Sequence, residues 1–294
     1  MFHVTRSMRK GFGSTPVSLP LSALVIFLSF TLMMSVVHVN SLGGIRLAAT
    51  SGPVFDDFTG PAGSAPNSQY WTIDPASTAG WANGEVGTYT DSPDNIRLDG
   101  QDHLVIQALS DATGYTTARV NTLGKVNMLY GRVEARMKLP AGYAIWPAFW
   151  LLGSNNPTVG WPQCGELDIA EMVSDDSNFH VSAHGPQNPQ ESYPDGFEIA
   201  AWPPSPIAVS QDFHIYWANR QFNSMQVGID DTILATYTPA SLPEGAQWVF
   251  NAPMYAILNV AVGSKFSGPP NDSTSFPATM LVDWFRYTPS PTTA

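Results

Sequence analysis

The stretch Cys164-Gly165-Glu166-Leu167-Asp168-Ile169-Ala170-Glu171-Met172-Val173 places three carboxylates in an apolar run. A short apolar run of this kind has the pattern of a buried strand. Side chains alternate between the two faces of a strand, so Glu166 and Asp168 share a face and strict alternation turns Glu171 away. A single β-bulge near Ile169 or Ala170 returns Glu171 to that face, and bulges are common beside active sites. We therefore predict three acids on one face of one strand.

Acidic residues are almost never buried without a reason, and here the reason is chemical. Two carboxyl groups that flank a glycosidic bond are the usual machinery of sugar-chain hydrolysis. Glu166 and Glu171 are long enough to lean together over Asp168, to the separation of roughly 5–5.5 Å that suits a retaining glycosidase. Like charges this close cannot all ionise, so one carboxyl keeps its proton at a raised pKa. The alternatives are a solvated acidic face or a calcium site, and the interleaved apolar residues argue against simple solvation.

The N-terminus has the pattern of an export signal. Arg6, Arg9 and Lys10 precede an uncharged apolar run over residues 17–39. Such a segment is a secretory signal or a single membrane anchor. We assign residues 1–50 to a signal peptide or signal anchor with a short spacer, 51–290 to one catalytic domain and 291–294 to a frayed tail. We expect the protein to be secreted or extracytoplasmic, either free or tethered to a membrane through residues 17–39.

Charge and cysteine content exclude several classes of function. The net charge is −11, and residues 1–50 hold four basic and no acidic residues, so the rest carries 9 basic and 24 acidic side chains. That surface repels nucleic acid, whose binding depends on Lys and Arg, whereas a neutral polysaccharide is unaffected. Cys164 is the only cysteine, which excludes an intramolecular disulfide. The six histidines lack the spacing of common metal motifs, so we expect no metal or other cofactor to be required for catalysis.

Short apolar or alternating segments recur between Gly, Pro, Asn and Asp clusters, and no long stretch with helical period follows residue 50. Many short strands with such turn signals are typical of an all-β sandwich or jelly roll. We predict two antiparallel sheets, one of which curves into a concave substrate cleft. The expected strands are 103–109, 116–121, 130–138, 145–152, 166–173, 179–184, 212–218, 224–229, 232–237, 254–262 and 280–287.

Motifs along residues 55–287 resemble glycoside hydrolase family 16, and within it the bacterial endo-β-1,3-glucanases, or laminarinases. The pieces, in chain order, are Trp81-Ala-Asn-Gly-Glu85, Tyr115-Thr-Thr-Ala-Arg119-Val-Asn121, Tyr130-Gly-Arg-Val-Glu-Ala-Arg136, Trp146-Pro-Ala-Phe-Trp150, the acid hexapeptide, His184-Gly-Pro186, Leu258-Asn259-Val-Ala-Val-Gly263 and Met280-Leu-Val-Asp283-Trp284. The resemblance implies a concanavalin-like β-jelly-roll sandwich, a monomer, and retention of anomeric configuration. It implies Glu166 as nucleophile, Asp168 as its helper and Glu171 as acid/base.

The matched positions also give candidate sugar contacts. Trp146 and Trp150 share a strand face, and aromatic side chains commonly line such sites; either could instead belong to the core. Arg119 could bind sugar hydroxyls or form an ion pair of little energetic value. The other candidates are Asn83, His184 and Trp161, and for His184 a structural role is nearly as plausible. Relatives often have tryptophan where Phe266 stands, which affects the choice of substrate but not the reaction.

Asp283 matches a position that, in relatives, helps to hold a structural calcium ion. Calcium takes several oxygen ligands, often including backbone carbonyls. Asp57 and the carbonyl of Gly100 could complete such a site, so we expect a structural calcium ion there. Its location is the sheet opposite the cleft.

The predicted function is endo-acting hydrolysis of β-1,3-glucan by double displacement. Two alternatives stay open: a transglycosylase that uses the same site, and a β-glucan-binding protein without hydrolysis. Family proteins that only bind glucan lack one or more of the carboxylates, and all three are present here. A sulfated-galactan hydrolase is a third possibility, which the low content of basic residues disfavours.

Overall fold

The computed structural model describes residues 51–75, 83–187, 196–201 and 208–291. All of them belong to one compact unit, Arg46–Ala294. The expected signal segment at 1–50, Trp81 and most of the expected tail lie outside the described residues. In the described part, no helix is long and apolar enough to cross a membrane.

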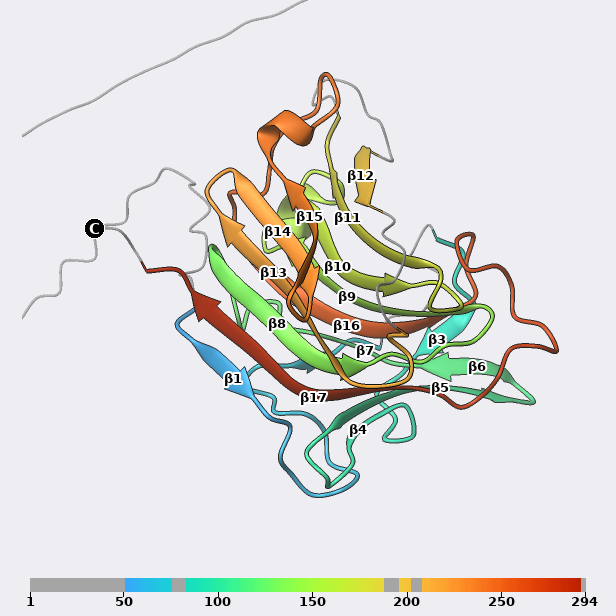
Figure 1. Cartoon of the computed structure of the whole chain (residues 1–294). Helices are drawn as coiled ribbons and strands as arrows, with labels where there is room; N and C mark the ends of the chain where they lie inside the picture. The colour runs from blue at the N-terminus through green and yellow to red at the C-terminus, as the bar shows by residue number, and fades with distance from the viewer. Residues whose placement is uncertain (1–50, 76–82, 188–195, 202–207, 292–294) are drawn as a thin grey trace, which may run out of the picture. The chain divides into compact units, whose positions relative to one another are not determined.

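The described chain folds into two sheets that face each other (Figure 1). The larger sheet has ten strands: β15 (Thr232–Tyr237), β14 (Ser224–Ile229), β13 (His214–Gln221), β8 (Gly131–Lys138), β17 (Ala278–Pro289), β5 (Leu104–Asp111), β6 (Gly114–Thr117) and β3 (Gly87–Tyr89) in order, with β1 (Val54–Asp56) beside β17 and β4 (Ile96–Leu98) beside β5. The smaller sheet has seven: β12 (Phe197–Ala201), β11 (Phe179–Gly185), β10 (Glu166–Met172), β9 (Ile145–Gly153), β16 (Met254–Val262), β7 (Arg119–Asn121) and β2 (Thr72–Ile73).

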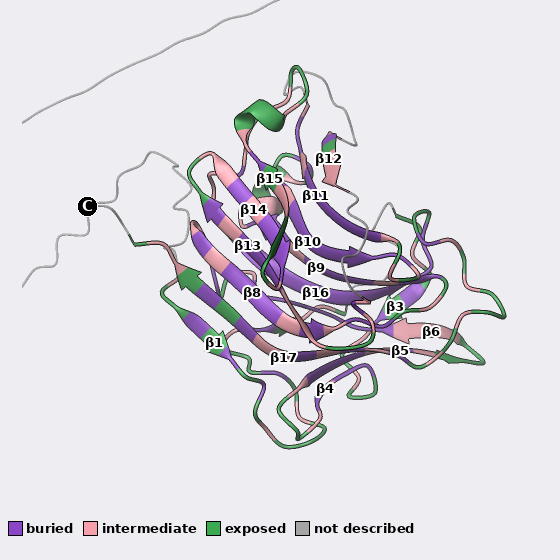
Figure 2. Ribbon diagram, viewed as in Figure 1, coloured by how far each residue is buried: buried purple, intermediate pink, exposed green. Residues whose placement is uncertain are grey.

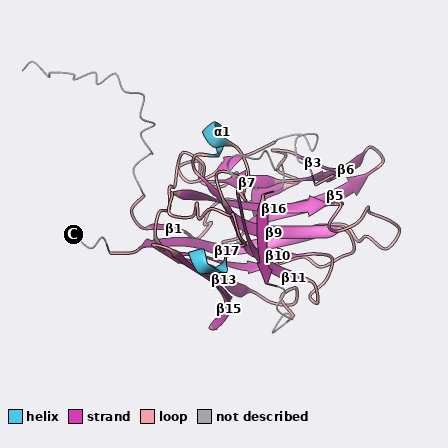
Figure 3. Ribbon diagram, turned by 90° about the horizontal axis from the view of Figure 1, so that it is seen from above, coloured by secondary structure: helices cyan, strands magenta, loops and turns pink. Residues whose placement is uncertain are grey.

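Strand pairing follows the predicted antiparallel pattern with one difference, because β3 and β6 run parallel. Helical structure in the described ranges is confined to α1 (Asn156–Val159) and the 3-10 turn η2 (Pro239–Ser241), which are the cyan pieces of Figure 3. The expectation of an all-β domain without long helices is confirmed. Large antiparallel sheets of this kind bury one face against each other and leave the second face available.

One predicted strand proved to be two. The segment expected as 116–121 contains β6 in the larger sheet and β7 in the smaller sheet, and the chain passes between the sheets at Ala118, which is fully buried. Apolar alternation continues through the crossing, so the sequence gives no sign of it. Strands β1 to β4 and β12 were not predicted, and these have only two to five residues each.

Apolar side chains from both sheets form the core, which Figure 2 shows as purple ribbon along the central strands. One cation also enters it. Arg220 on β13 is buried and donates hydrogen bonds to the carbonyls of Met128, Phe250 and Ala252, each at 2.8 Å. Burial lowers the pKa of this guanidinium to about 10. A buried donor with three fixed acceptors ties three separate segments to one point.

Strand β10 lies near the middle of the smaller sheet, between β9 and β11. Its apolar side chains Leu167, Ile169, Ala170 and Met172 are fully buried in the core between the sheets. The acids of the same strand must therefore use the other face, which positions the site described next.

Candidate active site

A β-bulge in β10 brings the three acids to one face. Asp168 lies opposite Ser182 and Glu171 opposite His180, so three steps along β10 match two along β11. The register with β9 also shifts, between Asp168 and Ala170. The extra residue reverses the alternation, which confirms the predicted bulge. Its physical basis is that Ile169 and Ala170 both point into the core.

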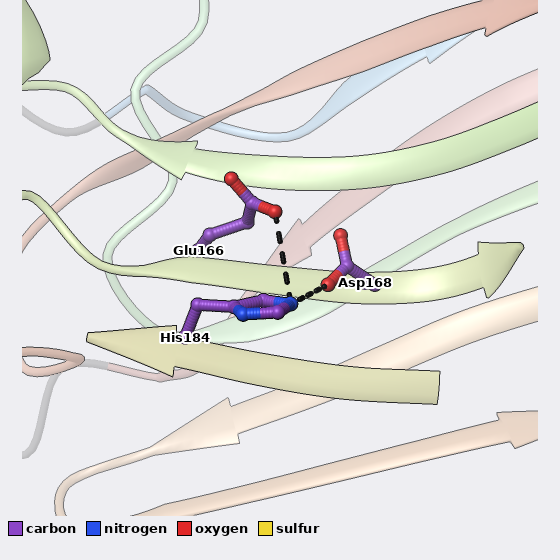
Figure 4. A group of neighbouring side chains, drawn as sticks. All are labelled: Glu166, Asp168 and His184. Carbon is purple, nitrogen blue, oxygen red and sulfur yellow. Dashed lines mark ion pairs between the residues drawn. The ribbon is translucent and has the colours of Figure 1, made fainter. Parts of the chain in front are cut away.

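Asp168 is the best-connected carboxylate of the three, and only 3 % of it is exposed. Ser182 Oγ donates to its Oδ2 at 2.5 Å, and Nε2 of His184 lies 3.1 Å from the same oxygen. Nε2 of His184 is also 3.9 Å from Oε1 of Glu166. Figure 4 shows the imidazole of His184, from β11, facing both carboxylates of β10.

Burial makes both glutamates hard to ionise. It is the largest cause that raises the pKa of Glu166, to about 8, and the charge of Asp168 adds to the effect. Burial and the charge of Asp168 likewise raise the pKa of Glu171 well above its ordinary value. Hydrogen bonds from Trp161 to Glu166 and from Trp146 to Glu171 act in the opposite direction. Two carboxyl groups in such surroundings can hold different protonation states at one pH.

The histidines of β11 differ in charge. Burial lowers the pKa of His184, but its hydrogen bond to Asp168 and the charges of Asp168, Glu166 and Glu171 outweigh burial and raise it to about 10. His184 is therefore an imidazolium at neutral pH. Burial lowers the pKa of His180 to about 4, so His180 is neutral there, and its Nε2 lies 2.7 Å from Oδ1 of Asn178.

Glu166, Asp168 and His184 bring three potential ligand atoms within 4.8 Å of one another. The charge on His184 explains this grouping as an ion-pair cluster. A protonated imidazole offers only N–H donors and has no lone pair for a metal. The grouping is therefore an ion-pair cluster while His184 keeps its proton, and an ion that bound there would have to displace that proton.

The two predicted tryptophans both lie on β9, half-buried, on the same side as the acids. Trp146 donates its indole N–H to Oε1 of Glu171 at 3.0 Å. Trp150 donates to Oδ1 of Asn259 at 2.8 Å. Asn259 in turn donates to the hydroxyl of Tyr89 at 3.3 Å. These bonds fix the orientation of both indole rings.

The other predicted contacts have varied surroundings. Arg119 is only 3 % exposed; its guanidinium donates to Oδ2 of Asp74 at 2.7 Å and lies 4.7 Å above the ring of Tyr89. This is the ion-pair alternative, in a buried form. Asn83 is exposed in the turn before β3, and Trp161 is exposed, with its ring 6.2 Å from that of His184. Trp161 is thus close to the acids, whereas Arg119 lies two strands away from β9.

Three residues of the site were not predicted: Ser182, His180 and Phe266. Ser182 and His180 precede His184 by two and four residues on a predicted strand, so alternation alone could have placed them beside it. The ring of Phe266 lies 5.3 Å from that of Trp146 and 4.9 Å from that of His180. Trp146 and His180 flank Glu171, so Phe266 covers the region of this carboxyl. Its position depends on a loop whose course the sequence does not reveal.

Cys164, just before β10, is buried, and burial raises the pKa of its thiol to about 12. It is a small core side chain and not a reactive thiol.

The residues of the expected calcium site have other partners. Oδ2 of Asp283 accepts a bond from Arg136 at 2.6 Å, and Oδ1 of Asp57 accepts from the backbone of Thr59 at 3.2 Å. These bonds use one oxygen of each carboxylate, so the second oxygen of each could bind an ion. The guanidinium of Arg136, however, already balances the charge of Asp283. Gly100, in the left-handed conformation, lies in an exposed turn. The calcium site remains a prediction, which a lower melting temperature on chelation would support and an unchanged one would contradict.

Comparisons with known proteins identify the family of this chain. A family model described as glycosyl hydrolases family 16 matches residues 82–286. The chain is 31% identical over 244 residues to glucan endo-1,3-beta-glucosidase A1 of Niallia circulans, covering 74% of this chain and 34% of that protein. It is 32% identical over 234 residues to a beta-glucanase of Rhodothermus marinus, covering 75% and 79%.

Among solved structures, the catalytic domain of a laminarinase from Thermotoga maritima MSB8 superposes with a TM-score of 0.70 at 34% identity. The match covers 81% of this chain and 97% of that chain. This likeness confirms the predicted β-jelly-roll fold. The chain spans about a third of the Niallia circulans relative and most of the other two proteins.

Proposed function

The chain belongs to glycosyl hydrolase family 16, and we propose that it is a retaining endo-β-1,3-glucanase. Membership of the family makes it a glycoside hydrolase. The names of the relatives, glucan endo-1,3-beta-glucosidase and laminarinase, support β-1,3-glucan as the substrate. The observation that carries the mechanism is the bulge of β10, which gives Glu166, Asp168 and Glu171 one common face.

Glu171 is the general acid in this proposal, because burial and the charge of Asp168 raise the pKa of its carboxyl well above the ordinary value and so favour the protonated form. The N–H of Trp146 occupies Oε1 of Glu171, which leaves Oε2 to carry the proton. Glu166 is the nucleophile: the imidazolium of His184 lies 3.9 Å from its Oε1 and favours ionisation, and the reactive carboxylate fraction grows as the pH rises toward its pKa of about 8. Asp168 holds that imidazolium in place.

The reaction has two steps. In the first, an oxygen of Glu166 bonds to the anomeric carbon while the glycosidic bond breaks and the departing oxygen takes the proton of Glu171. In the second, the carboxylate of Glu171 takes a proton from water, whose oxygen attacks the same carbon and releases Glu166. Two inversions retain the configuration, and both glutamates return to their starting states.

The substrate is tested by measuring reducing-sugar release and product profiles for the full chain, Glu166→Gln and Glu171→Gln. The polysaccharides are laminarin, lichenan, xyloglucan, agarose and carrageenan. We expect a ladder of oligosaccharides from laminarin that both variants lose. Release of single glucose units alone would contradict endo action. Retardation of the protein in a laminarin gel without any release would support a binding protein instead.

Azide rescue separates the two roles. With an aryl β-glucoside that has a good leaving group, Glu171→Ala plus azide should give the β-glycosyl azide, because the nucleophile is intact. Glu166→Ala plus azide should give the α-glycosyl azide, since azide then replaces the nucleophile. Exchange of these two outcomes, read by proton NMR, would reverse the assignment.

We also infer that the protein acts outside the cytoplasm. The support is the uncharged run over residues 17–39, preceded by three basic residues. Fractionation of cells that express the full chain tests this inference: activity in the medium or in the membrane pellet supports it, and activity confined to the cytosol contradicts it.

A further inference from the structure

Ser182 is a buried residue of β11 that lies directly opposite Asp168. Its Oγ is 2.5 Å from Oδ2 of Asp168, 3.1 Å from Nε2 of His184 and 3.5 Å from Oε2 of Glu171. One hydroxyl thus contacts three of the four ionisable groups at the centre of the site.

The hydrogen count decides how this hydroxyl is used. A serine hydroxyl has one hydrogen to donate and two lone pairs to accept with. His184 is an imidazolium and can only donate; the hydrogen on its Nε2 faces Oδ2 of Asp168 and Oγ of Ser182, each at 3.1 Å, so His184 cannot accept the hydrogen of Ser182. The single hydrogen of Ser182 then goes to a carboxylate, and the distances of 2.5 and 3.5 Å assign it mainly to Asp168.

We propose that Ser182 is a positioning residue for the two glutamates: its hydroxyl fixes Asp168 between them and offsets part of the Asp168 charge. This inference rests on the proposed function for its catalytic meaning, but the bonding stands on geometry alone. Asp168 is the charge that most opposes ionisation of Glu166 and Glu171 after burial itself. A donor on Asp168 therefore makes it easier for Glu166 to ionise and for Glu171 to release its proton.

Other charged or titratable groups face the glutamates and must be kept constant. On β11 these are His184, which favours both carboxylates, and His180, which lies opposite Glu171 and is neutral. On β12, Glu198 lies opposite His184, and its charge opposes ionisation of Glu166. A change at Ser182 removes none of these charged or titratable groups, so a shift would report the hydroxyl and its two close contacts, Asp168 and His184.

The test compares Ser182→Ala, which lacks the hydroxyl, with Ser182→Thr, which keeps it and suits a strand. The chain has only seven glutamates. Carbon-13 labelling of glutamate side-chain carboxyls, with assignment by Glu166→Gln and Glu171→Gln, would follow both site carboxyls by NMR across a pH titration. This measurement uses the full chain and does not require activity.

We expect the midpoints of Glu166 and Glu171 to rise by about half a pH unit or more in Ser182→Ala and to stay near wild type in Ser182→Thr. The shift of Glu166 is the most informative, because Glu166 lies opposite His184 and not opposite Ser182, so the effect reaches it through Asp168 or through His184. In an Asp168→Asn background, Ser182→Ala should move the Glu166 midpoint far less. If Ser182→Thr does not fold, this double-variant comparison carries the test.

Kinetics provide the link to catalysis. Both limbs of the pH profile of laminarin hydrolysis should move to higher pH in Ser182→Ala, whereas a merely structural defect would lower the rate without moving them. Unchanged NMR midpoints in a folded Ser182→Ala would overturn the inference, even if activity fell. A wild-type protein without glucanase activity would overturn the proposed function alone, since the NMR midpoints would still report the role of the hydroxyl.

Discussion

Replacing Glu166 with glutamine should stabilise the folded domain increasingly as the pH rises from 4.5 to 7. Burial raises the pKa of Glu166 from 4.5 to about 8 on folding. A carboxyl whose folded pKa is raised contributes stability that is full below its unfolded pKa and is lost as the pH rises through the folded value. Glutamine does not titrate, so the variant escapes this loss.

The magnitude follows from the pH interval. Each pH unit above the unfolded pKa of the carboxyl lowers the free energy of unfolding by roughly 1.4 kcal/mol, as long as the folded carboxyl stays protonated. The loss from pH 4.5 to 7 is therefore at most about 3 kcal/mol, and about 2–4 °C of melting temperature accompanies each kcal/mol for a domain of this size. In this interval the folded Glu166 carries its proton, so His184 loses little attraction when the side chain becomes an amide.

Urea unfolding at a series of pH values, followed by tryptophan fluorescence, gives the free energy of unfolding for the wild type and Glu166→Gln. The difference between the two should grow with pH, and Glu244→Gln, in an exposed turn, is measured beside it as a surface control. A constant difference for Glu166→Gln, within about 0.5 kcal/mol, would refute the burial of this carboxyl, because an exposed glutamate titrates alike in both states.

Three further substitutions test contacts of the site and core. Trp146→Phe removes the N–H bond to Glu171. A hydrogen bond to a charged acceptor contributes about 1.5–3 kcal/mol, so its loss should lower kcat roughly tenfold and move the basic limb of the pH profile to higher pH. A basic limb that does not move would contradict this prediction. Arg220→Met removes the donor to the carbonyls of Phe250 and Ala252, while the carbonyl of Met128 keeps its bond from the N–H of Met254, and the change should cost about 3 kcal/mol in urea unfolding; a loss below about 1 kcal/mol would argue against these bonds. Asn259→Ala releases the indole of Trp150 and should raise KM for laminarin several-fold with little change in kcat, whereas an unchanged KM would remove Trp150 from the binding surface.

Sequence alone predicted the parts of the fold that have a long enough pattern. The strands from β8 to β11 and from β13 to β17 have six or more residues, so their apolar periods are visible. Strands of two or three residues, such as β2 and β4, show no period at all. Their existence depends on pairing with distant partners, which only the folded chain provides.

The site was predictable to a similar degree. Glu166, Asp168 and Glu171 lie on one strand, so alternation and one bulge were enough to bring them together. Arg119 was not decidable, because its partner Asp74 is 45 residues away and in a segment without a motif. Phe266 was noticed as a departure, yet its contacts with residues of β9 and β11 arise from tertiary folding alone.

The bulge also explains why the two glutamates differ. Between Asp168 and Glu171 the strand advances only two ladder positions, as it does between Glu166 and Asp168. The extra residue therefore leaves the spacing along the sheet even and changes the local bend instead, since a bulge kinks and twists its strand. Glu166, on the regular side, lies within reach of His184, whereas Glu171, on the bent side, meets the indole of Trp146 and is 8 % exposed. The charge of His184 favours both carboxylates, and each glutamate accepts from an indole, but only Glu166 lies directly opposite His184 on the adjacent strand, so the two carboxyls have different surroundings.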